Sequence, residues 1–257
     1  MRFWLSAALF VFATDTVAQA APPGEQDPSP IQVPRPAPDF LFGRPDGSVG
    51  VRGGRVFSRA GSDWYDFVTD QLTIEHGAFN TPAVGFDVGI TVTPRLDVVV
   101  GVDFGKATVH SEYRRFVDNN RLPINQDTEI RGANISGSLR FALTERGREV
   151  GRLAWVPRSV VPYVGAGGGA YWFSIRQSGD FVDFVDLSVF KDVFRATGWA
   201  PSAQVFGGTD IKLHRRVFLN FEARYLWAAG DLGSEWIDFD PLDLAGLRLL
   251  TGVNFPF

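Results

Sequence analysis

The residues best suited to chemistry in this chain of 257 residues are charged side chains set at alternate positions within apolar segments. Successive side chains of a strand point to opposite faces, so these charges would lie opposite the apolar residues. Charges held in a narrow, poorly hydrated interior must pair with one another. We therefore expect interior ion pairs among Asp87, Asp103, Arg140, Asp210, Lys212, Glu222, Arg224 and Arg248, with Asp97 on the same face.

Two interpretations of these charges stay open. The main one is a structural plug of ion pairs, and the alternative is a narrow polar path for small solutes. Arg224 lies two positions from Glu222 and is expected next to the strand that carries Arg248, so the contacts of Arg224 are the first to examine.

Catalytic chemistry has few candidates. The only histidines are His76, His110 and His214. His110 and Ser111 are adjacent on a predicted strand and would point to opposite faces, so they are badly placed to act together. With no cysteine and no clustered histidines, the sequence predicts no catalytic residues, no metal site and no cofactor.

The elements that must position the interior charges are eight predicted strands. The second strand shows the pattern: Val84, Phe86, Val88, Ile90 and Val92 alternate with small or polar residues. In the last strand, Leu247, Leu249, Val253, Phe255 and Phe257 occupy alternate places, with Thr251 as the break. The predicted strands are 48–58, 82–93, 96–109, 129–143, 160–176, 199–213, 217–228 and the C-terminal segment.

The connections between these strands alternate in length. Short connections follow the second and sixth strands, and connections of about a dozen to two dozen residues follow the first, third, fifth and seventh. The connection 144–158 should be short and is extended instead. Each strand is long enough to cross a bilayer at a tilt, for which roughly 9 to 11 residues suffice. The predicted fold is all-β: an eight-stranded antiparallel up-and-down transmembrane β-barrel.

The N-terminal segment and the composition favour an exported chain. Arg2 and the apolar run Phe3 to Ala13, followed by Ala18-Gln19-Ala20, predict a signal peptide over 1–20 that is cleaved after Ala20. Residues 21–47 hold eight of the sixteen prolines and predict an extended periplasmic leader. The barrel would then cover 48–257. The formal net charge of −4 argues against a nucleic-acid partner.

The signal peptide, the eight alternating strands and the terminal Phe257 together resemble the small outer-membrane barrels of the OmpA and OmpX type. The stretch Tyr163 to Gly169 (YVGAGGG) is also similar to strands of porin-family proteins. The resemblance implies a monomer in the bacterial outer membrane, in contact with its lipid and lipopolysaccharide. It also implies insertion by the barrel-assembly machinery through the C-terminal strand that ends at Phe257.

With no grouped catalytic residues, we expect a non-enzymatic role in envelope integrity, adhesion or another surface interaction. A small passive, porin-like channel for small or hydrophobic solutes is the alternative, a lipid-modifying enzyme is a further one, and an exported soluble β-protein is the third. Arg114, Arg115, Arg121 and Arg131 lie near the loop 112–131, where they would either pair with lipopolysaccharide phosphates or be merely solvated. The loop 177–198 is expected to form a short amphipathic helix over the barrel mouth or an exposed adhesive patch.

Overall fold

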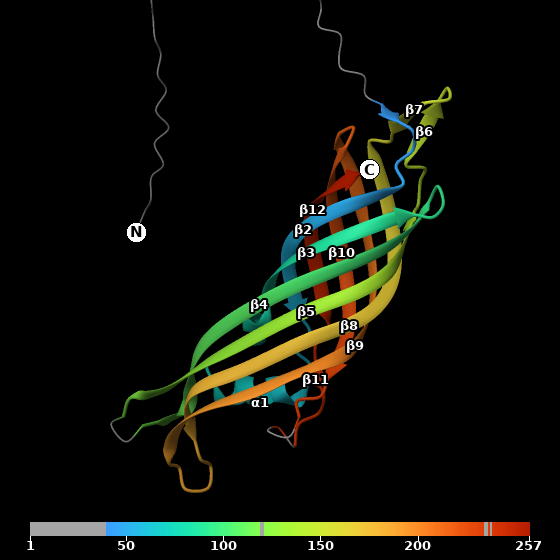
Figure 1. Ribbon diagram of the computed structural model, residues 1–257. Coiled ribbons are helices and arrows are strands. Elements are labelled where there is room, and N and C mark those ends of the chain that lie inside the picture. Colours follow the sequence, from blue (N-terminus) through green and yellow to red (C-terminus); the bar gives the residue numbers. More distant parts are fainter. Residues whose placement is uncertain (1–39, 119–120, 234–235, 237) are drawn as a thin grey trace, which may run out of the picture. The chain divides into compact units, whose positions relative to one another are not determined.

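The computed structural model describes residues 40–118, 121–233, 236 and 238–257, and eight long strands of these residues form a closed ring (Figure 1). Each strand pairs antiparallel with its neighbours, and β12 returns to pair with β2, with Phe255 opposite Val49. The strands are β2 (Gly47–Ser58), β3 (Thr81–Thr91), β4 (Leu96–Val117), β5 (Pro123–Ala142), β8 (Val160–Val182), β9 (Val189–His214), β10 (Val217–Gly230) and β12 (Gly246–Pro256). The predicted up-and-down barrel is confirmed. The predicted signal peptide, and the predicted leader as far as residue 39, lie outside the described residues.

The outer surface of the barrel carries the apolar side chains. On β3, Val84, Phe86 and Ile90 are all more than half exposed, whereas Asp87 between them is buried. The same inversion holds around the ring, since the exposed apolar set also includes Val98, Val100, Phe104, Ile135, Leu139, Phe141, Val164, Val205, Phe221, Trp227, Leu247, Leu249 and Phe255. An exterior of this kind is solvated by lipid, so the fold is a transmembrane barrel.

The two ends of the barrel differ. At the turn end, β3 and β4 are joined by residues 92–95, and β9 and β10 by residues 215–216. The opposite end, the loop end, holds the connections 59–80, 118–122, 183–188 and 231–245. No helix among the described residues is long and apolar enough to cross a membrane.

Four strands are much longer than predicted. β4, β5, β8 and β9 contain 20 to 26 residues, against 11 to 14 for the other four, and in Figure 1 they continue past α1 at the loop end. The predicted amphipathic helix over 177–198 is therefore wrong, and the alternative of an exposed adhesive patch stays a prediction. Gln177 pairs with Phe194 and Phe181 with Phe190, so β8 and β9 include most of this segment.

A hydrophobic cap lies at the loop end, and the sequence did not predict it. The helix α1 (Asp63–Gln71) has Asp63 and Asp66 in its first turn, where carboxylates favour the helix dipole. Trp64, Tyr65 and Val68 of this helix are buried against side chains of the long strands and of 231–245. Burial raises the pKa of Tyr65 well above its usual range. The cap is the cluster Ala60, Trp64, Tyr65, Val68, Leu72, Ile74, Phe79, Phe173, Ile175, Ala196, Leu232, Trp236 and Leu242, which also includes Phe79 of the short 3-10 helix η1 (His76–Phe79).

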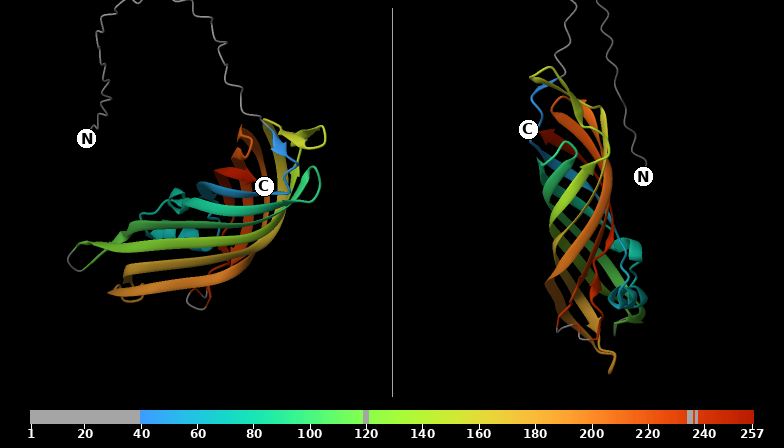
Figure 2. Two further views of the ribbon diagram at one scale, coloured as in Figure 1. Left: turned by 45° about the horizontal axis from the view of Figure 1, so that its top comes forward. Right: turned by 90° about the vertical axis from the view of Figure 1, so that its right-hand side faces the viewer.

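A small second sheet lies at the turn end. β6 (Gly147–Val150) and β7 (Ala154–Pro157) form a hairpin within the extended connection 144–158. β1 (Leu41–Phe42) adds to β7, with Leu41 opposite Trp155. β1 falls within the predicted leader, so the last residues of that segment belong to the folded part. Figure 2 shows this sheet beside the C-terminus and α1 near the opposite end; a last short strand, β11 (Leu242–Asp243), pairs with β10.

Candidate functional site

Five buried charged residues form a connected network in the middle of the lumen, which we call the central network: Arg52, Asp87, Asp103, Glu222 and Arg224. Arg52 on β2 lies 3.0 Å from Asp87 and 2.9 Å from Asp103. Arg224 on β10 lies 3.1 Å from Asp103 and 2.7 Å from Glu222. Because Asp103 accepts from both arginines, it joins opposite walls of the barrel through side chains that are less than a tenth exposed.

A second set of ion pairs lies nearer the turn end. Asp97 accepts from Arg140 at 2.9 Å and from Arg146 at 2.5 Å, and Arg140 also faces Asp210 at 3.6 Å. Asp210 further accepts from Asn254 and Asn220. Tyr163 connects this set to the central network, since its hydroxyl donates to Glu222 and accepts from Asn220.

These side chains fill the middle of the barrel interior. The cavity at the central network holds only about 20 Å³, and a neighbouring one beside Arg248 about 30 Å³. A single water requires roughly 10 to 15 Å³ on this scale, so each space has room for one or two waters. Together with the hydrophobic cap at the loop end, the packing leaves the described lumen obstructed at two levels.

The structure brings together most of the residues singled out from the sequence. Asp87, Asp103, Asp97, Arg140, Asp210, Glu222 and Arg224 all face the interior and make the ion pairs given above. Lys212 is partly buried near the turn end. Arg248 lies directly opposite Arg224 but makes no ion pair within the described part of the chain.

Two interior arginines were missed by the sequence reasoning. Arg52 precedes Gly53-Gly54, which have no side chains to mark the two faces of the strand, although Val49 and Val51 mark the outer face and place Arg52 on the inner one. Arg146 belongs to the extended connection before β6, and no periodic pattern there indicates that its side chain returns into the lumen.

Among the described residues, Arg248 is a buried cation without a carboxylate partner. It is 4% exposed, its Nε has no hydrogen-bond acceptor, and its guanidinium lies 5.6 Å from the centre of the Tyr171 ring. A buried, unpaired charge destabilises the folded state unless its contacts offset the loss of hydration.

We therefore expect Arg248→Met to leave the barrel equally stable or to stabilise it, by up to about 2 kcal/mol. The measurement is urea unfolding of the refolded protein in lipid vesicles, followed by tryptophan fluorescence. A loss of stability on this substitution would contradict the assignment of Arg248 as an unpaired charge.

The four arginines predicted to meet lipopolysaccharide are placed differently from one another. Arg114 on β4 donates to the carbonyl oxygens of Thr69 and Ile74, and Arg115 pairs with Asp70 at 3.1 Å, so both hold α1 and the chain after it against the barrel wall. Arg121 is in the connection 118–122 and has a positive φ of 62°. Arg131 on β5 faces outward and pairs with Glu129 at 2.6 Å.

A row of outward-facing cations crosses the four long strands on the loop-end side of the apolar belt, the band of exposed apolar side chains around the barrel. Lys106 pairs in register with Arg131, and Arg176 with Arg195. All four side chains are exposed, and Glu129, the carboxylate between them, binds Lys106 and Arg131. The row lies just beyond Trp172 and Trp199, which pair across β8 and β9. Paired tryptophans next to cations are typical of the membrane–water interface.

The histidines do not form a site. His110 is exposed and lies 2.8 Å from Asp127, while the neighbouring Ser111 is buried on the opposite face. His76 faces Asp66 at 3.6 Å near the loop end, and His214 ends β9 at the turn end. In the part of the chain that the structure describes, no three His, Asp or Glu side chains are grouped to hold a metal ion.

The closed ring, the apolar exterior and the charged interior define a transmembrane β-barrel with a filled lumen. No protein-family model and no curated protein matches the sequence. Among solved structures, Neisserial surface protein A has 13% identity and a TM-score of 0.44, covering 82% of this chain and 97% of that one. Ail, the attachment invasion locus protein of Yersinia pestis, has 13% identity and a TM-score of 0.39, with 82% and 99% covered. The outer membrane protein AlkL has 19% identity and a TM-score of 0.34, with 87% and 95% covered.

Proposed function

We propose that the protein is a monomeric barrel of the bacterial outer membrane that does not conduct solutes and acts without catalysis, through its structure and its surface. The observation that carries this proposal is the central network. Asp103 links Arg52 and Arg224 across the lumen, and the side chains around them leave a cavity of only about 20 Å³. An eight-stranded barrel has an interior just wide enough for side chains to fill, and here they are charged and paired.

The surface role rests on the four long strands. β4, β5, β8 and β9 exceed the roughly 9 to 11 residues that cross a bilayer, so their outer halves extend beyond the lipid at the loop end. We assign this end to the cell exterior, because short turns face the periplasm in barrels of this kind. Envelope integrity or adhesion are the roles that such a wall of strands supports.

Lipopolysaccharide phosphates fit the cationic row better than the set expected from the sequence. Lys106, Arg131, Arg176 and Arg195 face outward at the edge of the apolar belt, with one carboxylate, Glu129, bound to the first two. Arg114 and Arg115 instead hold α1 and the segment after it against the barrel wall. Guanidinium groups bind phosphate through paired, charge-assisted hydrogen bonds. Of the four arginines first considered, we retain Arg131 in this role.

The experiment that tests a closed lumen is single-channel recording in planar bilayers. We expect no reproducible open state from the refolded protein, because the central network and the cap both obstruct the lumen. Incorporation of folded protein is checked by a shift in gel migration between unboiled and boiled samples. A stable conductance from heat-modifiable protein would overturn the proposal in favour of a small passive channel. Altered lipid A or phospholipid in membranes that overexpress the chain would instead favour an enzyme.

A further inference from the structure

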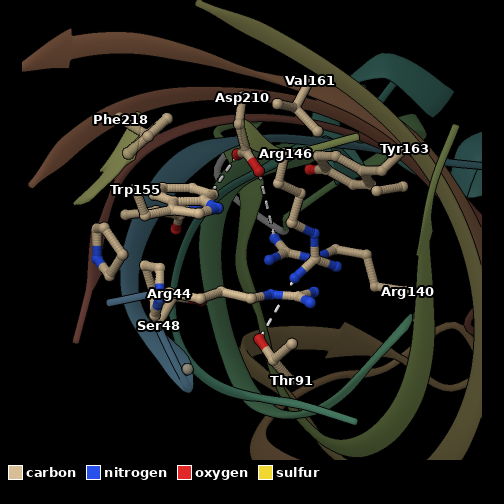
Figure 3. Close-up of a pocket in the computed structure, with 15 residues that line it drawn as sticks. Arg44, Ser48, Thr91, Arg140, Arg146, Trp155, Val161, Tyr163, Asp210 and Phe218 are labelled. Carbon is tan, nitrogen blue, oxygen red and sulfur yellow. Dashed lines mark hydrogen bonds and ion pairs between the residues drawn. The ribbon is translucent and has the colours of Figure 1, made fainter. Parts of the chain in front are cut away.

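A cavity of about 70 Å³ lies inside the turn end of the barrel, and the function proposed above does not use it. Three arginines reach it from different parts of the chain (Figure 3). Arg44 comes from the segment between β1 and β2, Arg140 from β5, and Arg146 from the connection before β6. The figure shows the three guanidinium groups directed toward one another.

The charges around this cavity do not balance. Asp97 binds Arg140 and Arg146, and Asp210 binds Arg140, so two carboxylates face three guanidinium groups. Arg44, which is only partly exposed, makes no hydrogen bond or ion pair with the rest of the described chain. Like charges that converge at a partly enclosed place repel one another unless an anion lies between them.

A second observation also indicates that an anion belongs in this cavity. Nη2 of Arg146 is buried and has no acceptor, although Nη1 of the same guanidinium binds Asp97 and Thr91. Buried donors in folded proteins are almost always satisfied, by protein or by a bound species. The unsatisfied donor belongs to a residue that lines the cavity, as Arg44 does.

The walls of the cavity limit what would fit. Trp155 from β7, Val161 from β8 and Phe218 from β10 contribute apolar surface, and Ser48 and Thr91 add hydroxyl groups. Small-molecule sites commonly combine apolar walls with a few convergent polar groups. A volume of about 70 Å³ admits several waters or one small anion, but not an oligosaccharide or a lipid headgroup with its chains.

We propose that this turn-end cavity binds the oxyanion of a small carboxylate or phosphate between Arg44 and Arg146. The oxyanion would accept from the unsatisfied Nη2 of Arg146 and neutralise Arg44. Its body would pack on Trp155. The site faces the compartment of the turns, on the opposite side of the central network from the loop end, so binding there is independent of whether the lumen conducts.

Calorimetric titration of the refolded full chain in detergent micelles tests this site, with inorganic phosphate and benzoate as separate probes. We expect saturable binding of at least one probe, and Arg44→Gln should weaken it about tenfold or more, because a charge-assisted pair is lost. Phosphate binding alone would assign the site to phosphate groups. Benzoate binding alone would assign it to carboxylates with a flat apolar body.

The matched control is Arg216→Gln, an exposed arginine at the same end that does not line the cavity. We expect it to leave binding unchanged. Arg44 makes no contact that folding would require, so heat-modifiable migration should be retained in the Arg44→Gln protein. The proposal is overturned if neither probe binds saturably, or if Arg44→Gln and Arg216→Gln weaken binding equally.

Discussion

Asp103→Asn should destabilise the barrel by about 3 to 5 kcal/mol, because it removes one charge that two buried arginines share. Asp103 is 2% exposed and accepts from Arg52 at 2.9 Å and from Arg224 at 3.1 Å. With asparagine in its place, two guanidinium groups face only Asp87 and Glu222. The measurement is the urea unfolding midpoint and slope in lipid vesicles.

The control for this substitution is Asp127→Asn. Asp127 on β5 is also paired, with His110 at 2.8 Å, but both side chains are more than half exposed. Exposed pairs contribute little to stability, so the unfolding midpoint should hardly move. Equal effects of the two substitutions would show that the central network does not stabilise the fold.

Gly165→Val should prevent correct closure of the barrel or cost about 3 kcal/mol. Gly165 on β8 faces the lumen, where a Cβ would collide with the ring of Phe206 and lie 2.6 Å from the carbonyl oxygen of Leu139. The Phe206 ring is itself held in place, since the guanidinium of Arg224 lies 5.0 Å from its centre. The yield of heat-modifiable protein on refolding into vesicles measures the effect.

Gly137→Val is the matched substitution on the neighbouring strand. Gly137 of β5 faces outward and is exposed, and a Cβ there meets no atom within 4 Å. Valine suits a lipid-facing strand position, so the folding yield should be preserved or improved. If both valine variants fold equally well, close packing at Gly165 is not required.

The barrel itself could be predicted from the sequence because apolar residues alternate strictly with small or polar ones wherever one face of a strand meets lipid. The alternation of Val84 to Ile90 on β3 with the single charge of Asp87 among them fixes which side is inside, and the eight predicted strands correspond to the eight strands of the ring. The same pattern predicts that the interior charges form ion pairs. The particular partner of each charge cannot be predicted in this way, because Arg52 and Asp103 meet across strands through a register that local sequence does not encode.

The loop end could not be predicted, for a different physical reason. Beyond the bilayer, both faces of a strand meet water or protein, so the alternation that marks 82–93 fades in 177–198. From the sequence, Phe181 and Phe194 are interpreted as part of an amphipathic helix or of an exposed apolar patch. In the fold they contact each other across β8 and β9 with ring centres 4.7 Å apart. The helix α1 was missed because its apolar side chains become a buried face only against the cap.

The arrangement of the central network has a consequence for assembly. Arg52 finds both of its carboxylates on β3 and β4, so this half of the sheet neutralises its own arginine. Arg224 finds Glu222 on its own strand, and the Asp103–Arg224 contact joins residues 121 positions apart. Each half therefore reaches near charge balance before β12 meets β2. For the central network, closure of the ring can then proceed with Arg52 and Arg224 each already paired to a carboxylate of its own half, whereas Arg248 of β12 enters without such a partner among the described residues.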